Sequence, residues 1–388
     1  MDHRETTPAP VYYVDDIEQD IAMSDIESEA PSDTTAETMS TLESQEAIGE
    51  NFSHVTVSEA SDSFAEYFQQ LNGRMFPADE NMPIALPTDL GEVKRLMLQH
   101  LQLKIFLGAN FYGPVREVLA PRPGDQKKKR VLDLITAEGS WVQDMAKDYP
   151  HVEFTSVDNT PLVQHIPRPN ISFEIYDLYN SIAEQSNKFD IVHLRHAAMH
   201  LKNPKALVRE IYRVLRPGGL FVFGNWELSA YEATAPDHPA LEKLPHLSRA
   251  LQLTRDGLTR QGVDVKMCHD MHLWLQPESD VWDLPDQLSS GFIDPFAEQM
   301  LGFRDIGYTP FLVPVGTWPT EKRMRDVAAI AQHGWAHIWR SMYAPFQFFG
   351  MSAEEAKQAV DRAIGDLSAP GVQVSVKYHA TFGFKREY

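Results

Sequence analysis

The chain of 388 residues has one cysteine, a shortage of basic residues and no long apolar run. The lone Cys268 excludes an intrachain disulfide and fits a reducing compartment, so we expect an intracellular protein of the cytoplasm or the nucleus. Lys and Arg number 35 against 55 Asp and Glu, which disfavours nucleic acid as a direct partner. No stretch is apolar enough to span a bilayer and no signal peptide follows Met1, so we expect no membrane association.

The negative charge is concentrated at the amino end of the chain. Residues 1–60 hold fifteen Asp and Glu against one Arg, a net −14 out of a formal −20. This segment has few large apolar side chains, so burial cannot offset the entropy cost of ordering it. We therefore predict a disordered acidic segment over 1–60. It acts either as a solubilising tail or as a docking or phosphorylation segment.

The rest of the sequence divides into three parts that we expect to form a single domain. Residues 61–120 show apolar residues at helical spacing, and we predict a helical cover there. Residues 121–228 alternate short apolar runs with helical segments and are predicted to form the ligand-binding α/β core. Residues 229–388 are predicted to supply a lid, helical insertions and the last strands.

The order of elements in the core is that of βαβ units, whose strands are parallel and whose crossovers are right-handed. The predicted strands are 131–134, 153–157, 171–175, 190–194 and 220–223, with helices at 140–148 and 204–215. Later segments predict helices at 247–261, 324–340 and 353–367, a strand at 302–314 and a closing antiparallel strand at 372–384.

Three acids follow three consecutive predicted strands, at the edge where open α/β sheets bind nucleotide-like ligands. Asp133 ends the first strand, Asp158 the second, and Asp177 follows the third, while Gly139 opens the first core helix. An acid after the second strand is placed to accept both ribose hydroxyls of a nucleoside. A lone acid at such a position is more often a turn or cap residue, so the argument depends on the three occurring together.

The sequences of these segments resemble those of class I S-adenosylmethionine-dependent methyltransferases. The closer resemblance is to the fungal LaeA-like branch, which is related to regulators of secondary metabolism. The resemblance covers roughly residues 90 to 385 and depends on the order and spacing of its motifs. They are Arg95-Leu96 with Gln99-His100, Val131-Leu-Asp-Leu with Gly139-Ser-Trp141, Val157-Asp158, Phe173-Glu-Ile-Tyr-Asp177, Phe189-Asp-Ile-Val-His-Leu-Arg195, Leu215-Arg-Pro-Gly-Gly219, Gly302-Phe303 and Pro314-Val-Gly-Thr-Trp-Pro319.

This resemblance implies a Rossmann-like, seven-stranded α/β sheet with helices on both faces, and S-adenosyl-L-methionine as the cofactor. It also implies roles for individual residues in holding that cofactor. Asp133 and Gly139 would flank the methionine moiety, Asp158 would hold the ribose, Asp177 and Leu178 the adenine, and Leu194 and Arg195 would line the floor of the site.

The first motif departs from the family pattern. The family has glycine where this chain has Ile135 and Ala137, and a small residue where it has Glu138. Glycines there permit positive φ and a close approach of the backbone to the ligand. We therefore weigh two functions: a methyltransferase acting on a small molecule or a protein, and a catalytically impaired regulatory or scaffold protein that has a regulatory partner. A dinucleotide-dependent oxidoreductase is a distant third, because its glycine fingerprint is absent.

Methyl transfer requires alignment of an acceptor, and a general base when that acceptor is a hydroxyl. His200 is our candidate base, and His196, Trp226 and Tyr231 are candidates for the acceptor pocket. His269 and His272 stand near one another, but no second half-site has the spacing of metal ligands, so we expect no metal.

Overall fold

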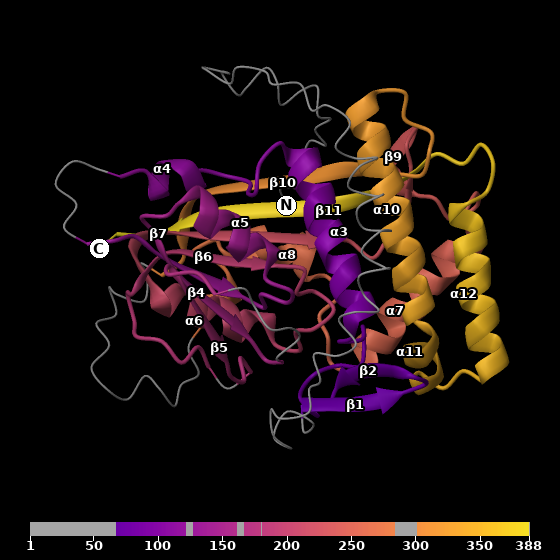
Figure 1. The fold of residues 1–388 in the computed structure, drawn as a ribbon, viewed down its shortest axis with the longest axis horizontal. Coiled ribbons are helices and arrows are strands. Elements are labelled where there is room, and N and C mark those ends of the chain that lie inside the picture. Colours follow the sequence, from indigo (N-terminus) through magenta and orange to yellow (C-terminus); the bar gives the residue numbers. More distant parts are fainter. Residues whose placement is uncertain (1–66, 122–126, 161–166, 180, 284–300, 388) are drawn as a thin grey trace, which may run out of the picture.

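The structure, a computed structural model, describes residues 67–121, 127–160, 167–179, 181–283 and 301–387 (Figure 1). The predicted acidic segment 1–60 lies outside these ranges. Within them, every helix is too short or too polar to cross a membrane.

A mixed sheet forms the centre of the domain. Its strands are β3 (Arg130–Leu134), β4 (Glu153–Asp158), β5 (Ile171–Ile175), β6 (Phe189–Arg195), β7 (Leu215–Trp226), β8 (Tyr231–Glu232), β9 (Ala235–Pro239), β10 (Phe303–Val315) and β11 (Val374–Lys385). The order is β5-β4-β3-β6-β7-β11, with β10 paired to β11 and the short pair β8–β9 attached at the start of β11. Strands β3 to β7 are parallel, whereas β10 and β11 are antiparallel. The predicted seven-stranded α/β sheet is therefore confirmed, with β8 and β9 added to it.

Helices cover both faces of the sheet because the side chains of each strand alternate between the faces. The helices are α3 (Leu90–Leu107), α4 (Val115–Leu119), α5 (Ser140–Asp148), α6 (Pro204–Val214), α7 (Pro245–Arg260), α8 (Met267–Trp274), α10 (Lys322–Ser341), α11 (Tyr343–Phe348) and α12 (Ala353–Leu367), with a 3₁₀ turn at Asp280–Trp282. In β3, Val131 packs with α4 and α5, whereas Leu132 and Leu134 pack with α6 and α8. Helices α7, α10, α11 and α12 gather beyond one end of the sheet, and α3 lies across the strands next to them (Figure 1). All five helices contribute to a third apolar cluster.

Two helices begin at the residues that local sequence signals predict. Helix α3 starts after Asp89, whose side chain accepts a hydrogen bond from the Glu92 N–H at 3.2 Å. Helix α12 starts with a complete capping box, in which Ser352 and Glu355 each bind the other's backbone N–H. Because a capping side chain binds N–H groups within one helical turn, the start of such a helix can be predicted from the local sequence.

The prediction of helix immediately after residue 63 is wrong for part of that segment. Phe68–Leu71 and Arg74–Pro77 form the antiparallel hairpin β1–β2. Asn72 and Gly73 connect its strands with φ of 50° and 77°, the positive values that a tight two-residue hairpin turn requires. Asn-Gly is a strong hairpin signal, and here it overrides the helical spacing of the apolar residues around it.

Candidate active site

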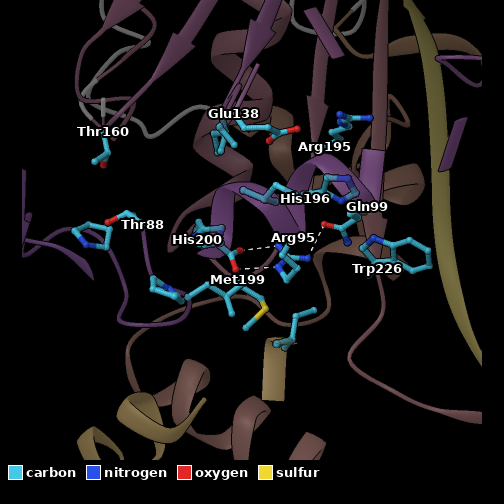
Figure 2. Close-up of a pocket in the computed structure, with 18 of the residues that line it drawn as sticks. Thr88, Arg95, Gln99, Glu138, Thr160, Arg195, His196, Met199, His200 and Trp226 are labelled. Atoms are coloured by element: carbon cyan, nitrogen blue, oxygen red, sulfur yellow. Dashed lines mark hydrogen bonds and ion pairs between the residues drawn. The ribbon is translucent and has the colours of Figure 1, made fainter. Parts of the chain in front are cut away.

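A large pocket opens at the carboxyl ends of β3, β4, β6 and β7, beneath helices α3 and α10 (Figure 2). It encloses about 1390 Å³ of empty space, part of which is open to solvent. Among the residues predicted for the site, its wall includes Asp158, Arg195, His196, His200 and Trp226.

The turn after β3 has the backbone shape of a glycine-rich turn without the glycines. Ile135 has a φ of 56° and Ala137 a φ of 51°, and Gly139, which precedes α5, has a φ of 78°. The left-handed region costs an L-residue about 1–2 kcal/mol, and a β-branched residue is especially unsuited to it. The two positions where the family pattern has glycine thus keep the glycine conformation. Both Ile135 and Ala137 line the pocket, whereas Gly139 does not.

Asp158 holds this turn against the end of β4. One carboxylate oxygen accepts the Ala137 N–H at 2.8 Å and the other accepts the Thr160 N–H at 3.1 Å. Burial raises the pKa of Asp158 to about 6, although these backbone hydrogen bonds oppose the rise. Each oxygen keeps a second lone pair, so the carboxylate can still accept a hydroxyl from the pocket.

Asp133, which is expected beside the methionine moiety, is not part of the pocket wall. It is 3% exposed, and its Oδ1 lies 2.7 Å from Nδ1 of His193, its register partner on β6. The His193 ring stacks on Trp141 of α5 with centroids 3.6 Å apart. Alternation along β3 turns Asp133 toward the α5 face, so its contacts are with the interior of the fold.

Four other predicted residues also lie off the pocket wall. Asp177 accepts the Tyr179 N–H at 2.8 Å, and it is Tyr179 that lines the pocket. Leu178 and Leu194 are 6% and 1% exposed and belong to the apolar cluster under α6 and α8. Tyr231 donates a hydrogen bond to Glu227 in a separate polar cluster near α8.

Arg195 is held in the pocket by a relay of polar groups from α3 and α5. Its Nη2 donates to Nδ1 of His100 at 3.0 Å, which leaves His100 Nε2 as the nitrogen that donates to Asp144 at 3.1 Å. Lys104 also binds Asp144, at 2.6 Å. The hydrogen bond from His100 and the nearby Lys104 lower the pKa of Asp144, while burial lowers the pKa of His100. His100 is therefore neutral and can accept from the guanidinium.

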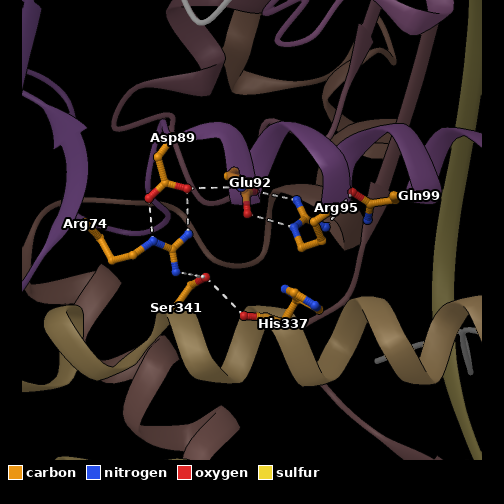
Figure 3. A network of polar contacts seen from close by, with 7 residues as sticks. All are labelled: Arg74, Asp89, Glu92, Arg95, Gln99, His337 and Ser341. Carbon is orange, nitrogen blue, oxygen red and sulfur yellow. Dashed lines mark hydrogen bonds and ion pairs between the residues drawn. The ribbon is translucent and has the colours of Figure 1, made fainter. Parts of the chain in front are cut away.

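Helix α3 contributes a buried ion pair to the pocket wall. Arg95 binds Glu92 through two hydrogen bonds of 2.9 and 2.6 Å, and both side chains are 4% exposed (Figure 3). A third donor of Arg95 reaches Gln99 at 3.0 Å. Arg95 and Gln99 belong to the family pattern in the sequence, whereas no sequence motif identifies Glu92. Their spacing of three and four residues on one helix face was the available signal.

A second ion pair fastens the start of α3 to the hairpin and to α10. Arg74 binds both carboxylate oxygens of Asp89, and its Nη1 donates to Oγ of Ser341 at 3.2 Å (Figure 3). Three segments that are distant in the sequence, β2, α3 and α10, therefore meet at one guanidinium. This contact fixes the helical side of the pocket relative to the sheet.

Glu138 is part of the pocket wall, on the same side as Arg195 (Figure 2). Burial raises the pKa of Glu138, and the positive charges of Arg195 and Arg95 and a hydrogen bond with Ser140 oppose the rise. Glu138 is thus a partly buried carboxyl group close to the Arg195 guanidinium, the group that can receive an anionic part of a ligand.

Two histidines after β6 face the pocket as neutral rings. Burial, with the charge of Arg95, lowers the pKa of His200 to about 4. His196 adopts a φ of 59°, and burial, with the charge of Arg195, lowers its pKa well below the usual value. Neither ring nitrogen of His196 has a hydrogen-bond partner among the described residues.

Buried donors without partners also line the pocket. Asn225 Nδ2, Trp226 Nε1 and Trp339 Nε1 lack acceptors within the part of the chain that the structure describes. All three residues line the pocket, and each is at most 8% exposed. Buried donors are normally satisfied, so these atoms favour a ligand that carries oxygen acceptors.

The proteins that are similar in sequence to this chain include fungal methyltransferases and regulators of secondary metabolism. A family model described as a methyltransferase domain matches residues 107–275. The secondary metabolism regulator laeA of Coprinopsis cinerea is 29% identical over 162 residues, 41% of this chain and 40% of that protein. Methyltransferase str3 of Strobilurus tenacellus is 31% identical over 157 residues, 40% of this chain and 53% of that protein. Methyltransferase pytC of Aspergillus terreus is 22% identical over 272 residues, 69% of this chain and 72% of that protein.

Proposed function

We propose that the chain is a class I S-adenosylmethionine-dependent methyltransferase of the LaeA-like branch, and that it transfers a methyl group to a small-molecule acceptor held in the pocket. The aligned region spans only 40% and 53% of the first two relatives, so the activity of the whole protein is part of this proposal. The observation that carries it is the pocket itself. It lies at the carboxyl ends of the parallel strands, where α/β sheets bind nucleotide-like ligands.

The residues at this edge fit a nucleoside that has a charged tail. Asp158 can accept ribose hydroxyls while it holds the Ala137 and Thr160 N–H groups. Thr136, in the same turn, has a buried hydroxyl without a partner among the described residues, and it lines the pocket. Arg195 is the cation placed to receive the carboxylate of the methionine moiety, and the His100–Asp144 relay limits its movement.

The acceptor is proposed to bind on the side of His196, His200 and the unpartnered donors. S-adenosylmethionine supplies an already activated methyl group, so the protein has mainly to align the acceptor atom. Asn225, Trp226 and Trp339 can donate to oxygen atoms of that acceptor, and the aromatic rings exclude water. His200 is neutral at pH 7, so its imidazole can accept a hydrogen bond from an acceptor hydroxyl and take its proton.

The second candidate function is a regulatory or scaffold protein with impaired catalysis. It is favoured by the strained turn at Ile135 and Ala137 and by Glu138, whose charge opposes a cofactor carboxylate near Arg195. One relative carries the name of a regulator of secondary metabolism. In this case a protein partner takes the place of the small-molecule acceptor. An intracellular place of action, in the cytoplasm or the nucleus, stays a prediction from the sequence.

Calorimetric titration of the full chain with S-adenosylmethionine and its demethylated product tests the proposal. We expect binding in the wild type, a loss of at least tenfold in affinity for Asp158→Ala, and no change for Asp256→Asn, an exposed acid on α7. No binding by the wild type at millimolar ligand, or equal affinity in Asp158→Ala, would contradict the proposed cofactor site.

A double variant separates the two candidate functions. Ile135→Gly with Ala137→Gly restores glycines at the two left-handed positions. If the wild type fails to bind the cofactor and the double variant binds it, the regulatory function is supported. If the wild type binds it and methylates an acceptor, the regulatory alternative fails.

A further inference from the structure

A cluster of metal-ligand side chains lies outside the pocket, where α8 packs on β11. Cys268 and His269 come from α8 and His379 from β11, and one ligand atom of each lies within 4.8 Å of the others. Cys268 and His379 are each 1% exposed, whereas the His269 side chain is 43% exposed. The cluster is therefore buried on one side and accessible from solvent on the other.

Glu227, directly after β7, adds a carboxylate to this group. Its Oε2 lies 3.0 Å from Nε2 of His379, and its Oε1 lies 3.5 Å from Nε2 of His269. The carboxylate therefore faces both imidazoles of the cluster.

The next layer of contacts orients these side chains. The Tyr308 hydroxyl lies 2.7 Å from Nδ1 of His379, and Tyr231 donates a hydrogen bond to Glu227. The ring of His272 stacks on Tyr308 with centroids 4.0 Å apart, which holds the hydroxyl in place. Histidine ligands of metals are usually held in this way through their second ring nitrogen.

The sequence predicted no metal because no second half-site has ligand spacing, but the fold brings His379 and Glu227 to Cys268 and His269 from distant segments. We propose that these four residues bind one Zn²⁺ ion, which joins α8 to the end of the sheet. One thiolate, two imidazoles and one carboxylate form a closed tetrahedral set that suits zinc and resembles structural rather than catalytic sites. Tetrahedral zinc holds its ligand atoms roughly 3.5 Å apart, and those of Cys268, His269 and His379 lie within 4.8 Å of one another, so about 1 Å of side-chain movement brings these three onto one ion.

Binding changes the protonation of the site in a defined way. The Cys268 thiol loses its proton to solvent, and the sulfur binds zinc as a thiolate. His379 binds through Nε2, so its ring proton moves to Nδ1 and is donated to the Tyr308 oxygen. The hydrogen bonds between Glu227 and the two imidazoles are replaced by bonds to the metal. Each zinc ion therefore displaces one proton from the protein.

Metal content and cobalt spectroscopy of the full chain, expressed without a histidine tag, test the proposal. We expect one zinc per wild-type chain, and loss of stoichiometric zinc in Cys268→Ala and His269→Gln. His238→Gln removes an exposed histidine on β9 and should leave the zinc content unchanged. The Co²⁺-loaded wild type should show a thiolate charge-transfer band, which Cys268→Ala abolishes. The band has a single source, because the sequence contains no other cysteine.

Several outcomes overturn the inference. Wild-type protein that takes up no zinc at micromolar concentration shows that the cluster is a hydrogen-bonded network only. Equal zinc in the wild type and Cys268→Ala, or a cobalt spectrum without the thiolate band, removes Cys268 from the site. Circular dichroism shows whether each variant folds. If Cys268→Ala does not fold, His269→Gln tests zinc binding, because His269 is exposed and its replacement disturbs the core little.

Discussion

Replacement of Ala137 by glycine is expected to stabilise the protein, although glycine usually destabilises. Ala137 has a φ of 51° in the turn after β3, and its N–H donates to Asp158 at 2.8 Å. Glycine keeps that N–H and adopts the left-handed conformation without a Cβ penalty. Ala137 belongs to none of the buried apolar clusters among the described residues, so the variant loses little packing.

Two terms of opposite sign decide the size of the effect. Relief of the left-handed alanine contributes about 1–2 kcal/mol, and the greater entropy of glycine in the unfolded chain removes about 0.4–1 kcal/mol. The net change in the free energy of unfolding is therefore about 0 to +1.6 kcal/mol. Ile135→Gly should gain less or lose stability, because the same relief of the left-handed backbone is offset by the loss of a half-buried side chain that packs on the cluster under α6.

Urea unfolding followed by tryptophan fluorescence measures these differences, with two matched controls. Ala359→Gly in the interior of α12 should lose about 1 kcal/mol, because its backbone is helical. Gly139→Ala should lose about 1–2 kcal/mol, because Gly139 has a φ of 78°. If Ala137→Gly loses as much stability as Ala359→Gly, the turn is not held in the left-handed conformation and the reasoning is refuted.

Three further predictions concern charged and titratable groups of the pocket. Arg95→Met leaves Glu92 buried and unpaired, so urea unfolding should show a loss of about 3–5 kcal/mol in the free energy of unfolding. Adding Glu92→Leu to the same chain should reverse most of this loss. Equal stability of the single and double variants would argue against the ion pair. Glu138→Gln should raise the affinity for S-adenosylmethionine by about 3–10-fold in calorimetry, because a carboxylate near the ligand's own is removed; unchanged or weaker binding would show that Glu138 turns away. Burial lowers the pKa of His200 from 6.5 in the unfolded chain to about 4 in the folded protein. As the pH falls from 6.5 to 4, the unfolded chain binds a proton that the folded protein does not, so the free energy of unfolding declines over this range. His200→Gln should reduce that decline by about 2–3 kcal/mol in unfolding measured at pH 7 and pH 4, and an unchanged pH dependence would contradict the burial of a neutral ring.

The sequence alone determined the architecture and part of the pocket wall. Strand alternation and parallel connections locate the edge where strands end, so Asp158, Arg195 and His196 were predicted near a ligand and do line the pocket. Helix starts such as Asp89 and Ser352 were also readable, because a cap acts on N–H groups two or three residues away. The missing glycines could be located by spacing, and the structure shows the glycine conformation kept there.

Only the tertiary structure decided which side chains meet. Asp133 looked like its neighbouring acids, but the pleat of β3 turns it toward His193 and away from the pocket. Glu92 and Arg95 became part of the pocket because α3 packs across the sheet end, which no local pattern on the helix states. Periodicity in a sequence says which side of an element is buried, but not which segment covers it. Contact between distant residues depends on the packing of whole elements, and that packing is a property of the complete fold.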